Sequence, residues 1–571
     1  NRGLSFGNKL SIYAERGGCI IIGTDGTGAN LWHPYLQKFR LYQNDPYDPQ
    51  TLALKSIRAI HEDREGNLWI GGYAGLDKLD RKSGKFIHLT NRGSNSIGLP
   101  GAVLVIREDL DDPLETLWMG TENYYLIKFN HVKEEVTRYP LLDETTGKVM
   151  ARSIRAVHCG LSGLLWIGTR DGLFAFDKSK EKFRLYQPAA DRSENTGILS
   201  VNVISGSKFK YLWIGTADNG LYRLDPDSKS FAHYDFGHIS DKSSGLNNIL
   251  ALYEDKNGIL WIGTLGGGLI RFNSVSGKYR FYTEQQGLPN NVVYGILEDE
   301  KGNLWLSTNR GISKFDPREE KFINYGIEDG LQSLEFNYNA YHKSRSGEMF
   351  FGGVNGVNAF YPDKVEDNPF IPPVVITNFQ IFNVPVTAGE SRNGKIILEK
   401  HITSTDRIHL SHEDKVISFE YAALQYAAPE KSEYAYILEG LESEWNYVGT
   451  RRFASYSNLS PGEYTFKVKA ANNDGHWNET GASINILVSP PFWGTWWFRL
   501  LIAGCTLLLI FLIYEVRTYG IRKRSRDLEK INIELNRQIT ERERAEHTLR
   551  ENEERLKILF DFAPDVYYLY D

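Results

Sequence analysis

The chain has 571 residues, of which 41% are apolar and 24% are charged. This composition excludes a disordered or fibrous chain, and at roughly 150 residues per domain the length predicts about three or four domains. The formal net charge of −6 argues against nucleic acid as a partner. Three cysteines are too few for a disulfide framework or a zinc site of the CxxC type. Because the chain opens at Asn1, without Met and without a signal segment, we expect a fragment of a longer protein.

One phrase, Leu-Trp-Ile-Gly-Thr or a close variant, recurs through residues 1–365 at intervals of 44 to 49 residues. A period of this length with Trp and Gly signals is typical of a β-propeller, in which each repeat forms one four-stranded blade. The sequence therefore predicts a mainly β fold that begins with a propeller of about eight repeat units, hence seven or eight blades. The copies are centred on Ile21, Trp69, Trp118, Trp166, Trp213, Trp261, Trp305 and Phe350.

Each repeat reads as four short strands separated by Asp, Asn, Gly and Pro residues, as tight hairpins require. The loops of the type Glu298–Asn303 could be taken for calcium sites. They lack the alternating oxygen ligands and the closing Glu of a calcium loop. We interpret them as turns and predict no metal site.

The repeats resemble the two-component-regulator propeller repeats of bacterial sensor proteins. The likeness covers about residues 1–365 and includes Gly-Leu-x-x-Asn-x-Val at 287–293. Members of that family usually carry two propellers ahead of a membrane span. The copy around Ile21 lacks the Trp, so it either forms an eighth blade or belongs to a preceding propeller.

In a meandering blade, the turn before the first strand and the turn between the second and third strands lie at the same end, here called the tip face. The second-strand phrase is constant while the residues after it vary, which is typical of a pocket assembled from many blades. Ordinary solvated loop tips are the alternative for any single residue. The candidate ligand-binding residues on the tip face are Tyr73, Glu122, Arg170, Asp218, Asn291 and Arg310.

Residues 372–489 follow a linker rich in Pro and Asn, and their apolar residues alternate with polar ones. Ile417, Phe419 and Tyr421 share one expected face, and the segment 464–470 alternates in the same way. This pattern predicts an immunoglobulin-like β-sandwich. The run from 434 to 464 resembles the triple-tyrosine domain that follows such propellers in the same sensors. We interpret its tyrosines as core and corner residues rather than ligands.

Residues 496–516 form an apolar run that is long enough to cross a hydrocarbon core of about 30 Å as a helix. A buried core helix would account equally well for the run alone. Trp residues gather before it and a basic cluster at 517–526 follows it, which favours a membrane span. By the positive-inside rule, the propeller and the sandwich are expected outside an inner membrane that the chain crosses once, with the C-terminal part in the cytoplasm.

Residues 517–556 carry apolar residues at alternating intervals of three and four, such as Leu528, Ile531 and Leu535. This spacing predicts a dimeric coiled coil. Residues 557–571 resemble the start of a PAS domain. His547 lacks the acidic residue and the nearby Pro that follow a phosphoacceptor histidine, so we interpret it as a solvated residue of the coil.

We find no motif for catalysis, and we predict no catalytic residue and no cofactor for this chain. The resemblance implies the extracytoplasmic, ligand-sensing part of a two-component sensor histidine kinase. The resemblance also implies a small polar ligand, since oligosaccharides are common inducers in relatives, and a response regulator that is reached through output domains outside this sequence. The coiled coil predicts a homodimer. A sensor for a cyclic-dinucleotide synthase and a propeller lyase are the alternatives.

Overall fold

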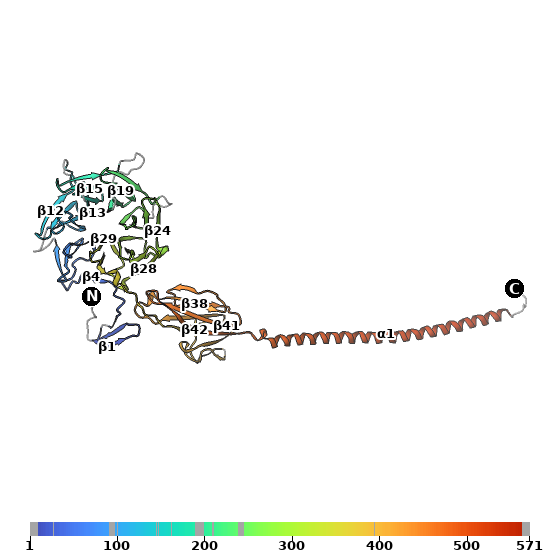
Figure 1. Ribbon diagram of the computed structural model, residues 1–571. Helices are drawn as coiled ribbons and strands as arrows, with labels where there is room; N and C mark the ends of the chain where they lie inside the picture. Colours follow the sequence, from blue (N-terminus) through green and yellow to red (C-terminus); the bar gives the residue numbers. More distant parts are fainter. Residues whose placement is uncertain are drawn as a thin grey trace, which may run out of the picture. The chain divides into compact units, whose positions relative to one another are not determined.

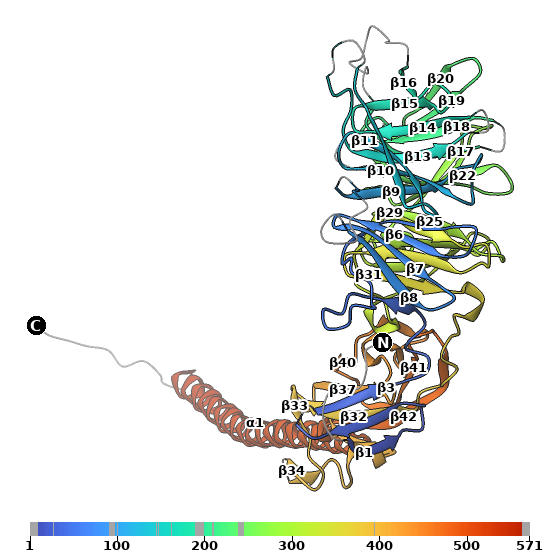
Figure 2. The same cartoon turned by 90° about the vertical axis from the view of Figure 1, so that its left-hand side faces the viewer.

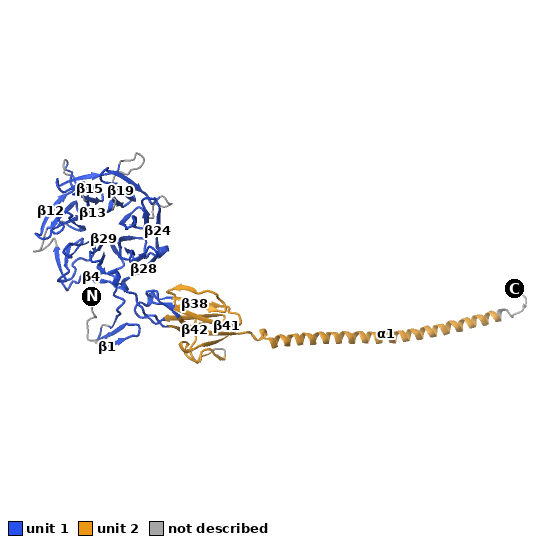
Figure 3. Ribbon diagram, viewed as in Figure 1, with its two compact units in different colours: residues 1–373, 423–433, 470–479 blue, residues 374–422, 434–469, 480–571 orange. Residues whose placement is uncertain are grey.

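The computed structural model describes residues 9–561, apart from residues 27, 91–97, 100, 144–145, 147, 161–162, 189–198, 208–209, 238–244 and 393. The fold is mainly β, as predicted, and one long helix follows the strands. The chain divides into two compact units, shown in Figure 3. Residues 1–373, 423–433 and 470–479 form the first unit, and residues 374–422, 434–469 and 480–571 form the second.

The first unit contains a propeller with seven four-stranded blades in the described part of the chain (Figures 1 and 2). The first strand of each blade is the innermost, because these strands contact one another around the ring. Blades 1 to 3 are β5 (Ile57–Glu62), β6 (Leu68–Gly72), β7 (Gly75–Asp80) and β8 (Lys85–Thr90); β9 (Val103–Glu108), β10 (Thr116–Thr121), β11 (Tyr125–Asn130) and β12 (Glu135–Pro140); and β13 (Ile154–Cys159), β14 (Leu164–Thr169), β15 (Gly172–Asp177) and β16 (Lys182–Tyr186).

Blades 4 to 6 repeat this order. They are β17 (Val201–Gly206), β18 (Leu212–Thr216), β19 (Leu221–Asp225) and β20 (Ser230–Tyr234); β21 (Ile249–Glu254), β22 (Ile259–Thr264), β23 (Leu269–Asn273) and β24 (Tyr279–Tyr282); and β25 (Val293–Glu298), β26 (Leu304–Thr308), β27 (Gly311–Asp316) and β28 (Lys321–Tyr325).

Blade 7 joins the two ends of the propeller. It consists of β29 (Phe336–Lys343), β30 (Met349–Gly353), β31 (Gly356–Phe360) and, as its outermost strand, β4 (Arg40–Tyr42). The repeat copy around Ile21 lies outside this ring. It forms a separate three-stranded sheet of β1 (Lys9–Ala14), β2 (Ile20–Thr24) and β3 (Gly28–Trp32). Of the two expected blade numbers, the structure therefore has seven.

The Trp of the recurring phrase anchors the turn between the first and second strands of its blade. The Trp69 indole N–H donates to Asp63 Oδ2 at 2.8 Å, and Asp63 Oδ1 accepts the backbone N–H of Asn67 at 2.8 Å. Trp305 and Asp299 repeat this pairing at 3.1 Å. The acidic residue of each such loop is thus occupied by its own turn, in agreement with the interpretation of these loops as turns.

The Gly and the Thr of the phrase hold neighbouring blades and turns together. A Cβ atom added at Gly215 would lie 2.5 Å from Ile249 Cγ2 on the innermost strand of the next blade. Only Gly permits this close approach of two blades. Thr216 Oγ1 donates to the carbonyl of Gly220 at 2.8 Å and closes the turn at the tip face.

The second predicted domain is a β-sandwich. One sheet consists of β33 (Val384–Pro385), β32 (Val374–Ile381), β37 (Val416–Ala423) and β40 (Phe453–Ser457). The other consists of β36 (Arg407–Ser411), β42 (Trp477–Ser489), β41 (Gly462–Ala471), β38 (Glu433–Glu439) and β39 (Asn446–Gly449), and a hairpin is made of β34 (Ser391–Arg392) and β35 (Lys395–Ile396).

The tyrosines of the sandwich lie where the sequence places them, in the core and at a corner. Tyr421 and Tyr434 are buried and their rings pack 5.3 Å apart. The Tyr464 hydroxyl donates to the carbonyl of Ser460 at 2.9 Å, which is the bond of a tyrosine corner. These contacts stabilise the sandwich rather than present a ligand surface.

Two loops of the sandwich sequence, 423–433 and 470–479, belong to the first compact unit. Lys431 Nζ lies 2.6 Å from both Glu328 Oε1 and Asp329 Oδ2, in the segment that joins blades 6 and 7. Lys38 Nζ lies 2.6 Å from Asp474 Oδ1. The side chains of Lys38, Asp329 and Asp474 are almost completely buried, so these ion pairs are internal features of the unit.

Helix α1 (Trp496–Asp561) is continuous over 66 residues, a length of about 100 Å at 1.5 Å per residue. It includes both the expected span and the expected coil. Among the described residues it is the one helix that is long and apolar enough to cross a membrane, and its apolar side chains are exposed. Most of the PAS prediction, from residue 562 onward, lies outside the described residues.

Candidate ligand-binding site

The innermost strands carry polar side chains near the tip face. In most of these strands the pairing with the second strand shifts by one residue near the start, so that the second residue has no partner. In blade 1 the shift lies between Ile57 and Ala59, and the unpaired residue is Arg58. The equivalent residues are Arg155 in blade 3, Asn202 in blade 4 and Tyr294 in blade 6. An unpaired residue of this kind aims its side chain away from the regular ladder.

The innermost strand of blade 7 has a larger bulge. Phe336 pairs with Gly353, and Tyr341 pairs with Phe351. Between these two pairs the chain advances five residues along β29 but only two along β30. Asn339, inside this bulge, has a φ of 63°, a left-handed conformation that Asn tolerates better than most residues. Its Nδ2 donates to the carbonyl of Arg155 at 2.6 Å, which joins blade 7 to blade 3 across the centre of the ring.

Arg58 is the centre of the most polar cluster on this face. Its guanidinium carbon lies 4.9 Å from the ring centroid of Tyr73 and 4.7 Å from that of Tyr338. Its Nε and Nη2 both donate to the Tyr73 hydroxyl, the first at 3.0 Å, and its Nη1 donates to Asn337 Oδ1 at 3.4 Å. Arg58 thus links blade 1 to the bulge of blade 7.

Neighbouring blades extend this polar surface. The Tyr294 hydroxyl donates to Asn309 Oδ1 at 2.9 Å in blade 6. Burial raises the pKa of Tyr294, and the nearby charge of Glu335 acts in the same direction, so the hydroxyl stays protonated and remains a donor. Arg155 Nη1 donates to Asn202 Oδ1 at 2.9 Å.

The buried Arg155 Nε has no hydrogen-bond partner in the described part of the chain. Donors and acceptors for a polar molecule therefore gather around the centre of the tip face. We call this group of residues the tip cluster; it consists of Arg58, Tyr73, Arg155, Asn202, Tyr294, Asn309, Asn337 and Tyr338.

The six residues that the sequence predicts have different surroundings. Tyr73 belongs to the tip cluster and is 48% exposed. The side chain of Asn291 is used within the structure, because its Oδ1 accepts the backbone N–H of Glu284 at 2.9 Å. The other four are exposed at the turns of different blades, and the structure does not bring them together around Tyr73: Glu122, Arg170, Asp218 and Arg310.

Most of the tip cluster was not predicted, because most of its residues lie in strands or in a bulge, whereas the predicted ligand-binding residues lie in turns. Arg58 and Arg155 stand second in their strands, a position that other blades fill with Leu250 or Asn202. A basic residue at a position that the other blades fill with uncharged residues is a signal that could have found them. The bulge at 337–340 has a weaker signal, a run of Asn and Tyr where other blades carry apolar residues.

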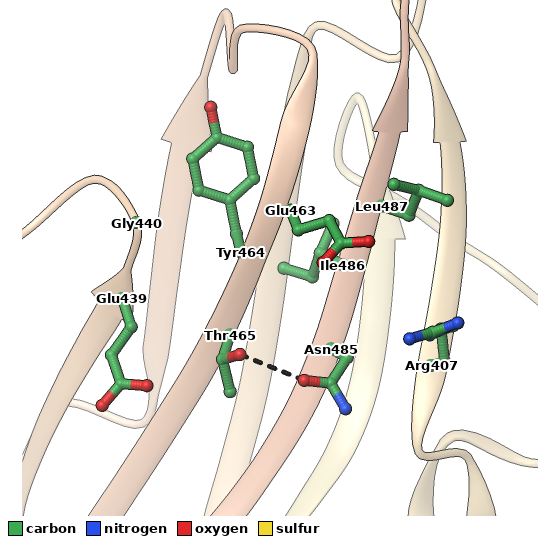
Figure 4. Close-up of a pocket in the computed structure, with 9 residues that line it drawn as sticks. All are labelled: Arg407, Glu439, Gly440, Glu463, Tyr464, Thr465, Asn485, Ile486 and Leu487. Carbon is green, nitrogen blue, oxygen red and sulfur yellow. Dashed lines mark hydrogen bonds between the residues drawn. The ribbon is translucent and has the colours of Figure 1, made fainter.

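Two pockets lie on the sandwich, one on each sheet. The first, of about 310 Å³, is lined by residues of β36, β38, β41 and β42, among them Arg407, Glu439 and Asn485 (Figure 4). Thr465 Oγ1 donates to Asn485 Oδ1 at 3.0 Å within it. The second, of about 460 Å³, includes Glu420 and lies on the other sheet. Neither pocket contains a predicted ligand-binding residue.

Comparison with known proteins agrees with this architecture. The model of the two component regulator propeller family matches residues 51–74, 243–266 and 287–310, and the model of the Y_Y_Y domain family matches residues 425–489. The chain carries two-component regulator propeller repeats and a Y_Y_Y domain. The matched segment 51–74 includes Arg58 and Tyr73, and so includes part of the tip cluster.

The chain is also similar to a histidine kinase and to solved extracellular domains of bacterial signalling systems. The chain is 28% identical over 546 residues to histidine kinase P4 of Formosa agariphila, with 94% of this chain and 35% of that protein covered. A solved structure, the extracellular domain of the putative hybrid two component system BT3049 of B. thetaiotaomicron, is 26% identical with a TM-score of 0.68 and covers 86% of this chain and 62% of that one.

The extracellular domain of the putative one component system BT4673 of B. thetaiotaomicron is 21% identical, with a TM-score of 0.47, and covers 84% of this chain and 63% of that one. The chain thus spans about a third of the length of the similar histidine kinase and less than two thirds of each of these two extracellular domains.

Proposed function

We propose that this chain is the sensor part of a two-component histidine kinase, and that its propeller binds a small polar molecule, such as an oligosaccharide, at the tip cluster. The observation that carries the proposal is the position of Arg58. A guanidinium between the rings of Tyr73 and Tyr338, with Asn337 beside it, joins two blades on the face where the turn sequences vary.

The chemistry of the tip cluster fits a ligand rich in hydroxyl groups. Arginine and asparagine side chains donate and accept hydrogen bonds, and tyrosine rings offer flat surfaces for the apolar faces of a sugar. Binding sites commonly combine a few convergent polar groups with aromatic walls in this way. Glu122, Arg170, Asp218 and Arg310, at the outer turns, would then contact the more distant parts of a larger ligand.

The signal is proposed to pass from the propeller to the Y_Y_Y domain and on to α1, which crosses the inner membrane once. Residues 517–556 would pair two copies of the chain as a coiled coil ahead of a PAS domain. A histidine kinase outside this sequence would then act on a response regulator. The similar histidine kinase and the extracellular domain of a hybrid two component system support this output.

Thermal unfolding of the full chain in lipid nanodiscs, with a panel of oligosaccharides, tests the binding site. A ligand at a hundredfold excess over its Kd stabilises the folded state by about 2.7 kcal/mol, which raises Tm by a few degrees. We expect R58Q and Y73A to abolish this increase. The matched control is R64Q, which removes an exposed arginine at the opposite end of blade 1. A shift that persists in R58Q and Y73A would overturn the proposed site.

A further inference from the structure

A second set of side chains, most of them polar, lies at the end of the innermost strands opposite the tip face. In each blade one residue pairs with the Trp of the recurring phrase or its equivalent, so these residues form one level of the propeller. They are His61, Arg107, His158, Ser205, Tyr253, Leu297 and His342. His342, His61, Arg107 and His158 come from four consecutive blades, in the order 7, 1, 2 and 3.

Two of the three histidines at this level are close together, and all three are uncharged at neutral pH. The ring centroids of His61 and His342 lie 5.2 Å apart. Burial, with Arg107 adding to it, lowers the pKa of His158 to about 4 and that of His342 to about 3. The Nε2 atom of His342 accepts the backbone N–H of Glu62 at 3.2 Å, so its proton is on Nδ1. A neutral imidazole has one N–H to donate.

His61 leaves one polar atom unused. Its Nε2 is buried and has no hydrogen-bond partner among the described residues. An unpaired buried polar atom costs free energy, of the order of 1–3 kcal/mol, unless something else at the site satisfies it.

Arg107 brings a positive charge to the same level, and none of the ion pairs in the described part of the chain includes it. Its Nη1 donates to the carbonyl of Ile106 at 2.8 Å, while the side chain as a whole is exposed to solvent. A guanidinium has five N–H donors, and this one therefore keeps donors for a bound molecule.

The nearest carboxylates are already paired with other cations. Glu62 accepts from Arg81 at 2.7 Å, and Asp109 accepts from Lys178 at 2.8 Å. Glu108 lies 3.4 Å from Arg64 and is also contacted by Arg345. The charge of Arg107 is thus left without a protein counterion at its own level.

We propose that Arg107, with the imidazoles of His61, His158 and His342, binds an oxyanion, a sulfate or carboxylate group, at the centre of the propeller opposite the tip face. Guanidinium binds such groups through two parallel N–H···O bonds, and the unpaired Nε2 of His61 can supply a further donor. This site is separate from the tip cluster and does not depend on it.

Inorganic sulfate is the probe for a free anion, and glucuronate, compared with methyl glucoside, is the probe for a carboxylate carried by a sugar. Calorimetric titration and Tm are measured on the full chain in nanodiscs, at constant ionic strength. We expect saturable binding of at least one of the two anions with a stoichiometry of one, and at least tenfold weaker binding by R107Q. R107K keeps the charge and should lose less affinity than R107Q. R184Q, which removes an exposed arginine on the outermost strand of blade 3, should bind as the wild type does.

The Tm without anion separates a binding role from a structural one. R107Q removes an uncompensated charge, so its Tm without anion should equal or exceed that of the wild type. Binding of sulfate alone would assign the site to free anions, and binding of glucuronate alone would assign it to anionic sugars. No saturable binding of either anion, or equal binding by R107Q, would overturn the proposal. Loss of the tip-face ligand response in R58Q with anion binding intact would show that the two sites are independent.

Discussion

The Trp residues of the repeat show how one side chain serves two purposes, filling the space between blades and bonding a turn. Trp305 is fully buried and donates to Asp299. Trp213 is equally buried, but its indole N–H has no partner among the described residues. A comparison of the same substitution at Trp305 and at Trp213 therefore separates the contribution of packing to stability from that of the hydrogen bond.

We predict that W305F destabilises the fold more than W213F does. Both variants lose part of a large ring, but only W305F also removes one of the two donors to Asp299 Oδ2, the other being Asn303 Nδ2 at 2.9 Å. The loss of that hydrogen bond costs about 1 kcal/mol. W213F instead removes an unpaired N–H group. Urea unfolding of each variant in nanodiscs, followed by tryptophan fluorescence, would measure the difference. Equal losses of stability would show that the indole bond contributes nothing.

A second prediction concerns the Gly of the repeat. In G215A the new Cβ would lie 2.5 Å from Ile249 Cγ2, so two blades must move apart. Overpacking of this kind typically costs about 1–3 kcal/mol. Gly504, which has open space around its Cβ position, provides the control G504A. The unfolding midpoint in urea should fall for G215A and stay unchanged for G504A.

At the level of elements, strand periodicity and turn residues were sufficient to predict the blades, because each blade is built from contacts close in sequence. The partner of β4 was not predictable in this way: Tyr42 pairs with Val357, more than 300 residues later. The bulge of β29 was missed for a related reason. Its hydrogen bond to Arg155 joins two blades that are not neighbours, and no local pattern records such a bond.

The helix α1 carries the expected coiled-coil seam on a single continuous element. We predict that L535C, at a seam position, forms a disulfide-linked dimer on mild oxidation in membranes, because a parallel coil would hold the two copies of this residue side by side. T540C lies on the outer side of the same heptad and should link much less. Cys505 is replaced by Ser in both variants. Non-reducing electrophoresis gives the result, and equal cross-linking at both positions would contradict a dimer with this seam.

At the scale of the whole molecule, the ion pairs of Lys431 bind a loop of the sandwich sequence to the segment between blades 6 and 7. Burial lowers the pKa of Lys431, but the carboxylates of Asp329 and Glu328 outweigh it, and the net pKa is raised. A raised lysine pKa stabilises the fold fully below the unfolded value of about 10.5 and loses this effect as the pH rises through the folded value.

We predict that K431M lowers the free energy of unfolding by about 2 kcal/mol at pH 7, less than the loss of a fully buried pair because Glu328 and Lys431 are partly exposed. The difference from the wild type should shrink above pH 10.5 as the lysine loses its proton. It should also shrink in acid, because Lys431 keeps the pKa of Glu328 below its usual range and that contribution is lost as the pH falls through the folded value. Urea unfolding of K431M and of the wild type at a series of pH values would measure this difference in the free energy of unfolding. A difference that does not depend on pH would show that K431M loses packing and not an interaction between charges.

The closing strand β4 has a mechanical consequence. The chain enters the ring through β4 and leaves it through β31, and these two strands are hydrogen-bonded neighbours in one blade. A force applied between the N-terminal sheet and the sandwich therefore acts on the three residue pairs of β4 with β31, together with the ion pair of Lys38 with Asp474. Under tension, this ion pair and the short strand would give way together, and the propeller would open at blade 7 before any other blade is deformed.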